Sequence, residues 1–346
     1  MGMLDKARDS AQSLRNKWAY RDTGSTVGTP AGKSGRSWVP NIEGVWLRRS
    51  AIALAILLIV YYPLGAWWTH KVDDNLNFEI QTEVLPGQSR AVAITADLID
   101  REVNQNNWVA NNPFFLPASI LDNMPNFQKG VVAALARFSF ELTDQLGRTR
   151  GSSEADPDLQ SAAGLLQYPG DVWVWDPTVS LAPTATSEAQ YRQAMRKLRT
   201  YNSRLAAGDA TFQKRADNLL ATLDRIALDI GSTSAVLDRH VLERSGFALD
   251  SQADDVFYFT KGQVYGYALI LRELRRDFDA LIVERELGDA WDELTLSMQQ
   301  TVDLNPWVII DGAPDSQFVP SHLSAQGFYL LRARTQLREI TNILLK

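Results

Sequence analysis

The chain has 346 residues, a formal net charge of −6 and no cysteine. The lack of cysteine excludes disulfides, thiol nucleophiles and zinc–thiolate sites, and a chain of this length can bury a core without them. The charge is unevenly distributed. Residues 1–49 carry a net charge of +5, residues 50–68 carry no charged side chain, and residues 69–346 carry a net charge of −11. This acidic C-terminal part argues against nucleic acid as a partner.

The N-terminal part reads as a basic tail. Residues 22–40 contain four glycines, two prolines and many hydroxyl side chains, a composition that buries too little apolar surface to order itself. We therefore predict that residues 1–44 form a basic, partly disordered cytoplasmic tail.

Residues 45–69 are predicted to form one transmembrane helix. Ser50–Trp68 is an uncharged run of 19 residues, close to the length that crosses the hydrocarbon core as a helix. Basic side chains before the run can snorkel to one interface, and aromatic rings at its end suit the other. The predicted interface residues are Arg48, Arg49, Tyr61, Tyr62, Trp67 and Trp68. A buried core helix and a cleaved signal peptide are the alternatives.

The charge asymmetry also predicts the topology of the chain. Basic flanks stay in the cytoplasm, so the N-terminus is expected there and the acidic part on the far side. A mitochondrial transit peptide is disfavoured because Asp5 and Asp9 interrupt the N-terminal segment. We expect the bacterial inner membrane, with the main domain in the periplasm and lipid as a partner through the single span.

Residues 70–346 are predicted to form an all-α domain, a large extracytoplasmic helical bundle with long antiparallel helices. The clearest apolar stripe predicts a helix over 210–244, capped by Asp209. A second helix, antiparallel to this one, is predicted just before it. The basic face of that preceding helix, over 190–204, is expected to form salt bridges. Gly262 and Gly266 are expected to allow close helix packing within the domain.

The C-terminal helix carries a leucine every seven residues, which predicts a narrow buried stripe. We expect this stripe to dock within the domain, with contact to a second chain as the alternative. Its leucines are Leu323, Leu330, Leu337 and Leu344.

Two segments resist the helical interpretation. Residues 172–177 have an alternating side-chain pattern and are bounded by prolines on both sides, which predicts a short strand or an extended arm. Residues 303–320 are predicted to form a long loop with apolar content. Together with an aromatic pair further upstream, these segments define a candidate interaction surface. Its residues are Phe114, Phe115, Trp173, Trp175 and Trp307.

No residue pattern indicates a catalytic, cofactor or metal site. The three histidines share no metal-ligand spacing, and no nucleophile elbow is present. Carboxylates do occur in pairs, which we interpret as solvated surface because 41 acidic residues produce chance pairs. These pairs are Asp73–Asp74, Asp97 with Asp100, Asp156 with Asp158, Asp254–Asp255 and Asp292–Glu293.

The stretch Asn112-Pro-Phe-Phe-Leu-Pro-Ala-Ser-Ile-Leu-Asp-Asn-Met-Pro-Asn-Phe-Gln-Lys-Gly130 and the overall layout resemble a proteobacterial family of uncharacterised membrane-anchored proteins, domain of unknown function 2333. The resemblance extends from residue 40 to the end of the chain. It implies an inner-membrane location in a Gram-negative cell. It implies no activity and carries over no catalytic residue.

The leading functional hypothesis is a non-catalytic scaffold or adaptor that binds a protein partner in the cell envelope, with self-association left open. Two alternatives remain. One is a periplasmic hydrolase that uses carboxylates on cell-wall glycan. The other is a helical lipid- or ligand-binding module that uses the aromatic residues of the candidate surface.

Overall fold

The structure is a computed structural model that describes residues 42–148, 155–175, 181–244, 251–314 and 316–346. The chain forms two compact units, residues 1–54 and 55–346. The predicted tail lies almost entirely outside the described residues. The second unit holds the whole helical domain together with the C-terminal part of the first described helix.

The first described helix, α2, runs from Ile42 to Thr69 and contains Pro63. Over Val45–Thr69 it has a mean hydropathy of 1.9, and only 6% of its most apolar window is buried by the rest of the chain. Helices in a soluble core bury such a surface, whereas α2 leaves its leucines and isoleucines exposed. It therefore has the length, composition and exposure of a membrane-spanning helix.

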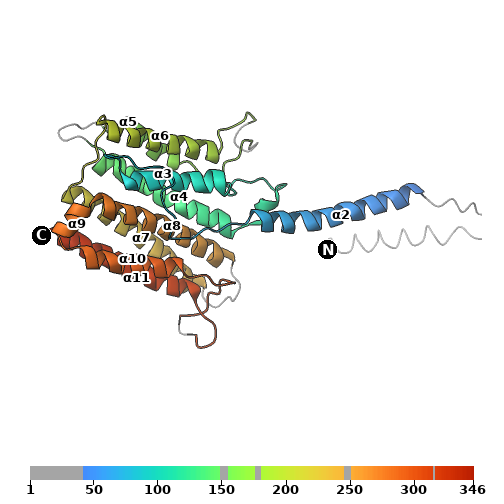
Figure 1. The fold of residues 1–346 in the computed structure, drawn as a ribbon. Helices are drawn as coiled ribbons and strands as arrows, with labels where there is room; N and C mark the ends of the chain where they lie inside the picture. The colour runs from blue at the N-terminus through green and yellow to red at the C-terminus, as the bar shows by residue number, and fades with distance from the viewer. Residues whose placement is uncertain (1–41, 149–154, 176–180, 245–250, 315) are drawn as a thin grey trace, which may run out of the picture. The chain divides into compact units, whose positions relative to one another are not determined.

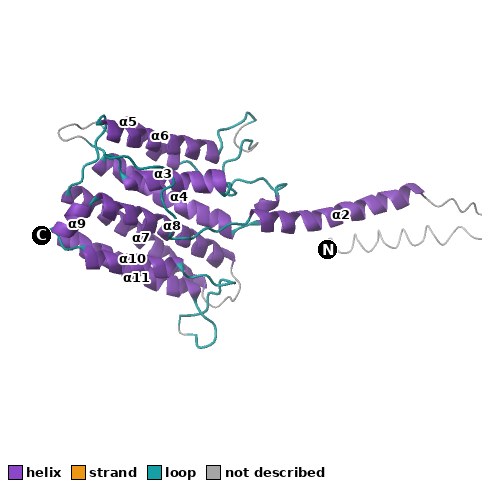
Figure 2. Ribbon diagram, in the orientation of Figure 1, coloured by secondary structure: helices purple, strands orange, loops and turns teal. Residues whose placement is uncertain are grey.

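The rest of the described chain is helical, as the sequence predicted (Figure 2). Short π-helical turns, Arg101–Gln105 and Leu142–Leu146, extend α3 and α4, and Pro117–Ile120 forms a 3₁₀ turn. The α-helices of the domain are α3 Arg90–Asp100, α4 Asn123–Glu141, α5 Pro157–Leu166, α6 Ser187–Ala207, α7 Ala216–Arg244, α8 Ser251–Asp277, α9 Asp279–Glu284, α10 Gly288–Val302 and α11 His322–Leu344.

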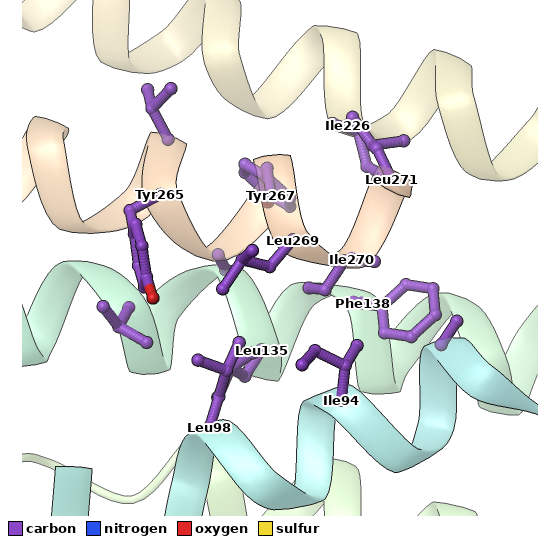
Figure 3. Close-up of a cluster of buried hydrophobic side chains, with 14 of the residues drawn as sticks. Ile94, Leu98, Leu135, Phe138, Ile226, Tyr265, Tyr267, Leu269, Ile270 and Leu271 are labelled. Carbon is purple, nitrogen blue, oxygen red and sulfur yellow. The ribbon is translucent and has the colours of Figure 1, made fainter. Parts of the chain in front are cut away.

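Helix α8 lies at the centre of the domain. It packs against α3 and α4 on one side and against α10 on the other. Helices α5 and α6 pack on the side of α3 and α4, and α7 and α11 lie on the side of α10 (Figure 1). Ile94, Leu135 and Ile270 meet where α3, α4 and α8 converge (Figure 3). A Cβ at Gly262 would lie 2.0 Å from the Phe127 carbonyl oxygen, so α4 and α8 touch through their backbones. This confirms the packing predicted for Gly262.

The long helices run along a common direction in both senses, with the packed pair α4 and α8 parallel to each other, so their loops gather at two ends of the bundle (Figure 1). At the anchor end, where α4, α6, α8 and α11 begin, Trp108 donates to the Gly170 carbonyl and Lys261 donates to the Leu304 carbonyl. At the far end, Ser89 donates to Asp277 and accepts from Asn202. The chain enters the domain from α2 at the anchor end, where the Lys71 amide contacts the Met124 sulfur.

The leucine stripe of α11 docks within the domain, as predicted: Leu323, Leu330, Leu337 and Leu344 are all buried. The basic face of α6 forms the expected salt bridges, since Lys197 pairs with Asp158 and Arg204 with Asp156.

One local prediction needs correction. Helix α7 begins at Ala216, and Asp209 is not its cap. Residues 209–215 are held outside the helix because the Thr211 carbonyl accepts from Tyr201 and the Gln213 amide donates to the Leu146 carbonyl. Of the two alternatives predicted for residues 172–177, the described part, 172–175, forms the arm: no strand occurs among the described residues apart from an isolated bridge between Asp311 and Ser321.

Candidate functional site

Three of the five predicted surface aromatics meet at the anchor end. The rings of Phe114 and Phe115 are 5.6 Å apart, and Phe115 lies 5.6 Å from Trp173 on the neighbouring arm, both edge to face. Phe114 nevertheless leaves 83% of its surface exposed and Phe115 leaves 47%. We call Phe114, Phe115 and Trp173 the aromatic cluster. Phenylalanine side chains with so large an exposed fraction are typical of an interaction surface.

The aromatic cluster is fastened to the C-terminal part of α2. The Tyr62 hydroxyl donates to the Phe114 carbonyl at 2.7 Å, and the Tyr61 hydroxyl donates to the Phe115 carbonyl at 3.2 Å. Pro117 lies so close to Gly65 that a Cβ there would come within 2.4 Å of the proline ring. Glycine at this position therefore allows the loop to pack directly on the helix.

The other predicted site residues lie apart from the cluster. Trp175 is exposed further along the same arm, and Trp307 is fully exposed on the loop between α10 and α11. The predicted interface residues at the two ends of the apolar run are all solvent-accessible: Arg48, Arg49, Trp67 and Trp68. The sequence alone could not show that Tyr61 and Tyr62 bind a loop more than fifty residues away.

Residues 70–89, the connecting segment between α2 and α3, are fixed to the bundle by buried cations. The Lys261 ammonium, which has no exposed surface, lies 2.6 Å from the Asp74 carboxylate. The Arg101 guanidinium is 2% exposed and lies 3.6 Å from the Asp73 carboxylate. Asp73 and Asp74 are thus partners of buried cations, which corrects the prediction that they are merely solvated surface.

The remainder of the connecting segment is held through its backbone. Arg272 on α8 donates to the carbonyls of Leu76 and Phe78, both at 2.7 Å. Asp97 on α3 accepts from the amides of Gln81 and Thr82, at 2.8 and 3.1 Å. Hydrogen bonds to charged groups are the stronger ones in proteins. The segment is therefore a fixed part of the domain and not a flexible tether.

A buried ion pair lies beneath the connecting segment. The Arg101 guanidinium and the Glu102 carboxylate are 2.6 Å apart, with 2% and 0% of their side chains exposed. Arg101 also donates to the Tyr265 hydroxyl, which in turn donates to the Asn75 carbonyl of the segment. Burial raises the pKa of the Glu102 carboxyl, although the arginine opposes this shift. The pair links α3, α8 and the connecting segment in one polar network.

A pocket of about 440 Å³ opens at the anchor end beside Trp307. Asp122, Asp254 and Tyr258 line it, and Asp254 is half-buried where α8 begins. Burial, followed by the nearby charges of Asp122 and Asp255, raises the pKa of Asp254 to about 6. Sequence reasoning missed this arrangement, because the Asp254–Asp255 dipeptide gave no sign that Asp122 lies beside it.

Asp254 gives the fold an unusual pH dependence. Its ordinary pKa is 3.8 and its pKa in the folded protein is about 6. The folded state therefore keeps a proton that the unfolded chain has lost, so the free energy of unfolding falls as the pH rises from about 4 to about 6. Asp254→Asn is expected to remove this decline and to unfold at a higher temperature than wild type at pH 7. Thermal melts across this range test it, and parallel melting curves for the two proteins would contradict it.

Among the described residues, no group of three or more histidine, aspartate or glutamate side chains is placed to hold a metal ion. A second pocket of about 410 Å³ lies between α4, α7 and α8 and is lined by Val236, Val256 and Phe259. None of the aromatic cluster lines it.

The fold and the site define an all-helical protein with one helix suited to span a membrane. Residues 41–251 match the family described as an uncharacterised protein conserved in bacteria, domain of unknown function 2333, and the chain belongs to this family. This confirms the family predicted from the Asn112–Gly130 stretch, although the match ends at residue 251 and not at the end of the chain as predicted. No curated protein and no solved structure matches the chain.

Proposed function

We propose that this protein is a single-pass protein of the bacterial inner membrane, and that its periplasmic bundle is a scaffold or adaptor for a protein partner in the envelope. The apolar helix α2 and the change of net charge from +5 to −11 across it support the location and the orientation. The N-terminal tail is then cytoplasmic, and membrane lipid surrounds α2.

The fixed connecting segment is the observation that carries the scaffold role. Buried Lys261 and Arg101 hold Asp74 and Asp73, so the bundle cannot swing freely about the end of α2. A scaffold must present its binding surface at a defined place above the membrane. A domain that only had to reach a diffusing substrate would work as well on a long flexible linker.

The partner surface that we propose lies on α10 and α11. Leu296, Phe328 and Leu331 expose between 49% and 58% of their surfaces. The two helices adjoin there, because Arg332 donates to Gln300 at 3.3 Å. Large apolar side chains exposed on adjoining helices are typical of a protein contact.

Photo-crosslinking in intact cells tests the scaffold role. A photoreactive amino acid in place of Leu331 is expected to yield a discrete heavier species whose partner mass spectrometry identifies. The same group in place of Leu85, which is also exposed but lies at the far end, is the matched control and is expected to yield none. A heavier species that contains only this chain would assign the face to self-association. The absence of any discrete species at Leu331 would overturn the proposed surface.

A second candidate function rests on the Asp254 pocket. A half-buried carboxyl with a pKa of about 6, beside the carboxyl of Asp122, has the protonation behaviour of a general acid. This favours a carboxylate-dependent hydrolase of cell-wall glycan over a ligand carrier. Release of soluble fragments from purified cell wall by the full-length protein, and its loss in Asp254→Asn, would support the hydrolase. Equal release by wild type and variant would exclude it.

A further inference from the structure

The loop that carries the aromatic cluster is attached to α2 within the apolar run and not beyond it. Tyr61, Tyr62 and Gly65 are the helix residues that bind it. At a rise of about 1.5 Å per residue, Gly65 lies about 5 Å and Tyr61 about 10 Å before Trp68 along the helix. If Trp68 marks the lipid–water boundary, the loop lies on the bilayer side of that boundary.

Moving the membrane-spanning part of α2 toward the N-terminus would place the loop outside the bilayer, but this move is disfavoured. Such a shift would carry Arg48 and Arg49 deeper into the hydrocarbon, where charged side chains are strongly disfavoured. The chain can instead keep Trp67 and Trp68 in the headgroup region, where amphipathic rings collect. The loop then lies between the headgroups and the outer ends of the acyl chains.

The carbonyls at the start of the loop are paired within the chain. Four consecutive carbonyls, from Pro113 to Leu116, all accept hydrogen bonds within the chain. The donors are the Leu116 amide, the Tyr62 and Tyr61 hydroxyls, and the Ser119 amide and hydroxyl. Pro113 and Pro117 have no amide hydrogen to satisfy. Backbone groups at membrane depth must be paired inside the protein, and these carbonyls meet that requirement.

The exposed side chains of the anchor end match this placement. Phe114 and Ile120 expose 83% and 56% of their surfaces on this loop, and Leu181 on the neighbouring arm exposes 84%. Among the described residues, the large apolar side chains exposed near the far end are Leu85, Phe140, Val283 and Leu345, and only Phe140 is aromatic. Apolar exposure with aromatic rings is therefore concentrated where α2 joins the domain.

We propose that the Pro113–Ile120 loop inserts its phenylalanines into the outer leaflet of the membrane that α2 crosses, so that the bundle has a second lipid contact beside its span. The partner of this surface is the lipid bilayer itself. The inference rests on the proposed span. The connecting segment supports it, because a domain fixed at Asp73 and Asp74 cannot lift the loop away from the membrane.

Lipid-dependent fluorescence quenching tests the insertion. The chain has no cysteine, so a single cysteine can carry a polarity-sensitive fluorophore at any chosen site. Three full-length variants are needed: Phe114→Cys on the loop, Leu57→Cys within the apolar run, and Phe140→Cys. Phe140 is a matched control because it is 45% exposed near the C-terminal end of α4, away from the loop. Each is reconstituted into phosphatidylethanolamine–phosphatidylglycerol vesicles whose lipids carry a nitroxide near the headgroup or near the acyl-chain end.

At position 114 we expect strong quenching by the shallow nitroxide, weaker quenching by the deep one, and a several-fold loss of quenching by aqueous iodide relative to position 140. Position 57 should be quenched most by the deep nitroxide. If position 57 responds to lipid nitroxide while position 114 responds only to iodide, loop insertion is refuted and the span stands. If position 57 also fails to respond, the span and the proposed function fall with it. Circular dichroism of each labelled protein confirms that the substitutions leave the helices intact.

Discussion

Replacing Arg101 with methionine is expected to lower the free energy of unfolding by about 3–5 kcal/mol, the usual cost of removing one partner from a buried ion pair. The Glu102 carboxylate has no exposed surface, and only Gln128 would remain to donate to it through its side chain, at 3.3 Å. The variant also loses the guanidinium that lies 3.6 Å from Asp73, so the connecting segment should loosen. Urea denaturation of the full-length protein in mild detergent measures the effect.

The loss in Arg101→Met should depend on pH. Without the guanidinium, burial raises the pKa of Glu102 further, because the opposing charge is gone. A raised carboxyl pKa adds stability at low pH that is lost as the pH rises through it, so the deficit should be larger at pH 8 than at pH 5.

Two variants control for the Arg101 result. The double variant Arg101→Met, Glu102→Gln removes both charges and should recover much of the lost stability. Arg215→Met breaks an exposed ion pair with Asp217 whose atoms are equally close, at 2.6 Å, and should destabilise the protein far less because solvent screens this pair. If Arg101→Met costs no more than Arg215→Met, the buried pair does not hold the segment.

Replacing Leu337 with alanine is expected to cost about 2–5 kcal/mol, because it opens a cavity where the side chain is fully buried. The leucine lies in the stripe by which α11 packs against α7 and α10. The loss should not change with protein concentration, since the stripe docks within one chain. Urea denaturation at several concentrations measures it.

Leu331→Ala is the matched control for Leu337. Leu331 is on the same helix and 54% exposed, so its truncation should change stability by less than about 0.5 kcal/mol. A Leu337→Ala protein that kept full stability but lost self-association would show that the stripe is an interface between chains.

Local patterns in the sequence predicted most of the helices. The uncharged run of α2, the leucine period of α11 and the basic face of α6 each lie within one element, where helical spacing decides which residues share a face. The start of α7 was predicted wrongly because Tyr201 and Leu146, both outside that helix, hold residues 209–215 in a loop.

The candidate site was predicted only in part. Phe114, Phe115 and Trp173 were predicted to belong to one interaction surface, but segments outside the helices have no period that shows which of its aromatics meet. The fixation of the connecting segment was missed because Lys261 and Asp74 are 187 residues apart in the chain. An aspartate that pairs with a buried lysine has the same local sequence signature as one that faces water. Only the fold distinguishes the two.

The central claim is that the bundle lies outside the cytoplasm and is carried there by α2. A reporter enzyme that is active only outside the cytoplasm, fused after Lys346 in a Gram-negative host, tests this most directly. The matched control carries the same reporter after Arg49, before the apolar run. We predict activity for the fusion after Lys346 and none for the fusion after Arg49. An inactive C-terminal fusion, together with an active cytoplasmic reporter at the same position, would contradict the account.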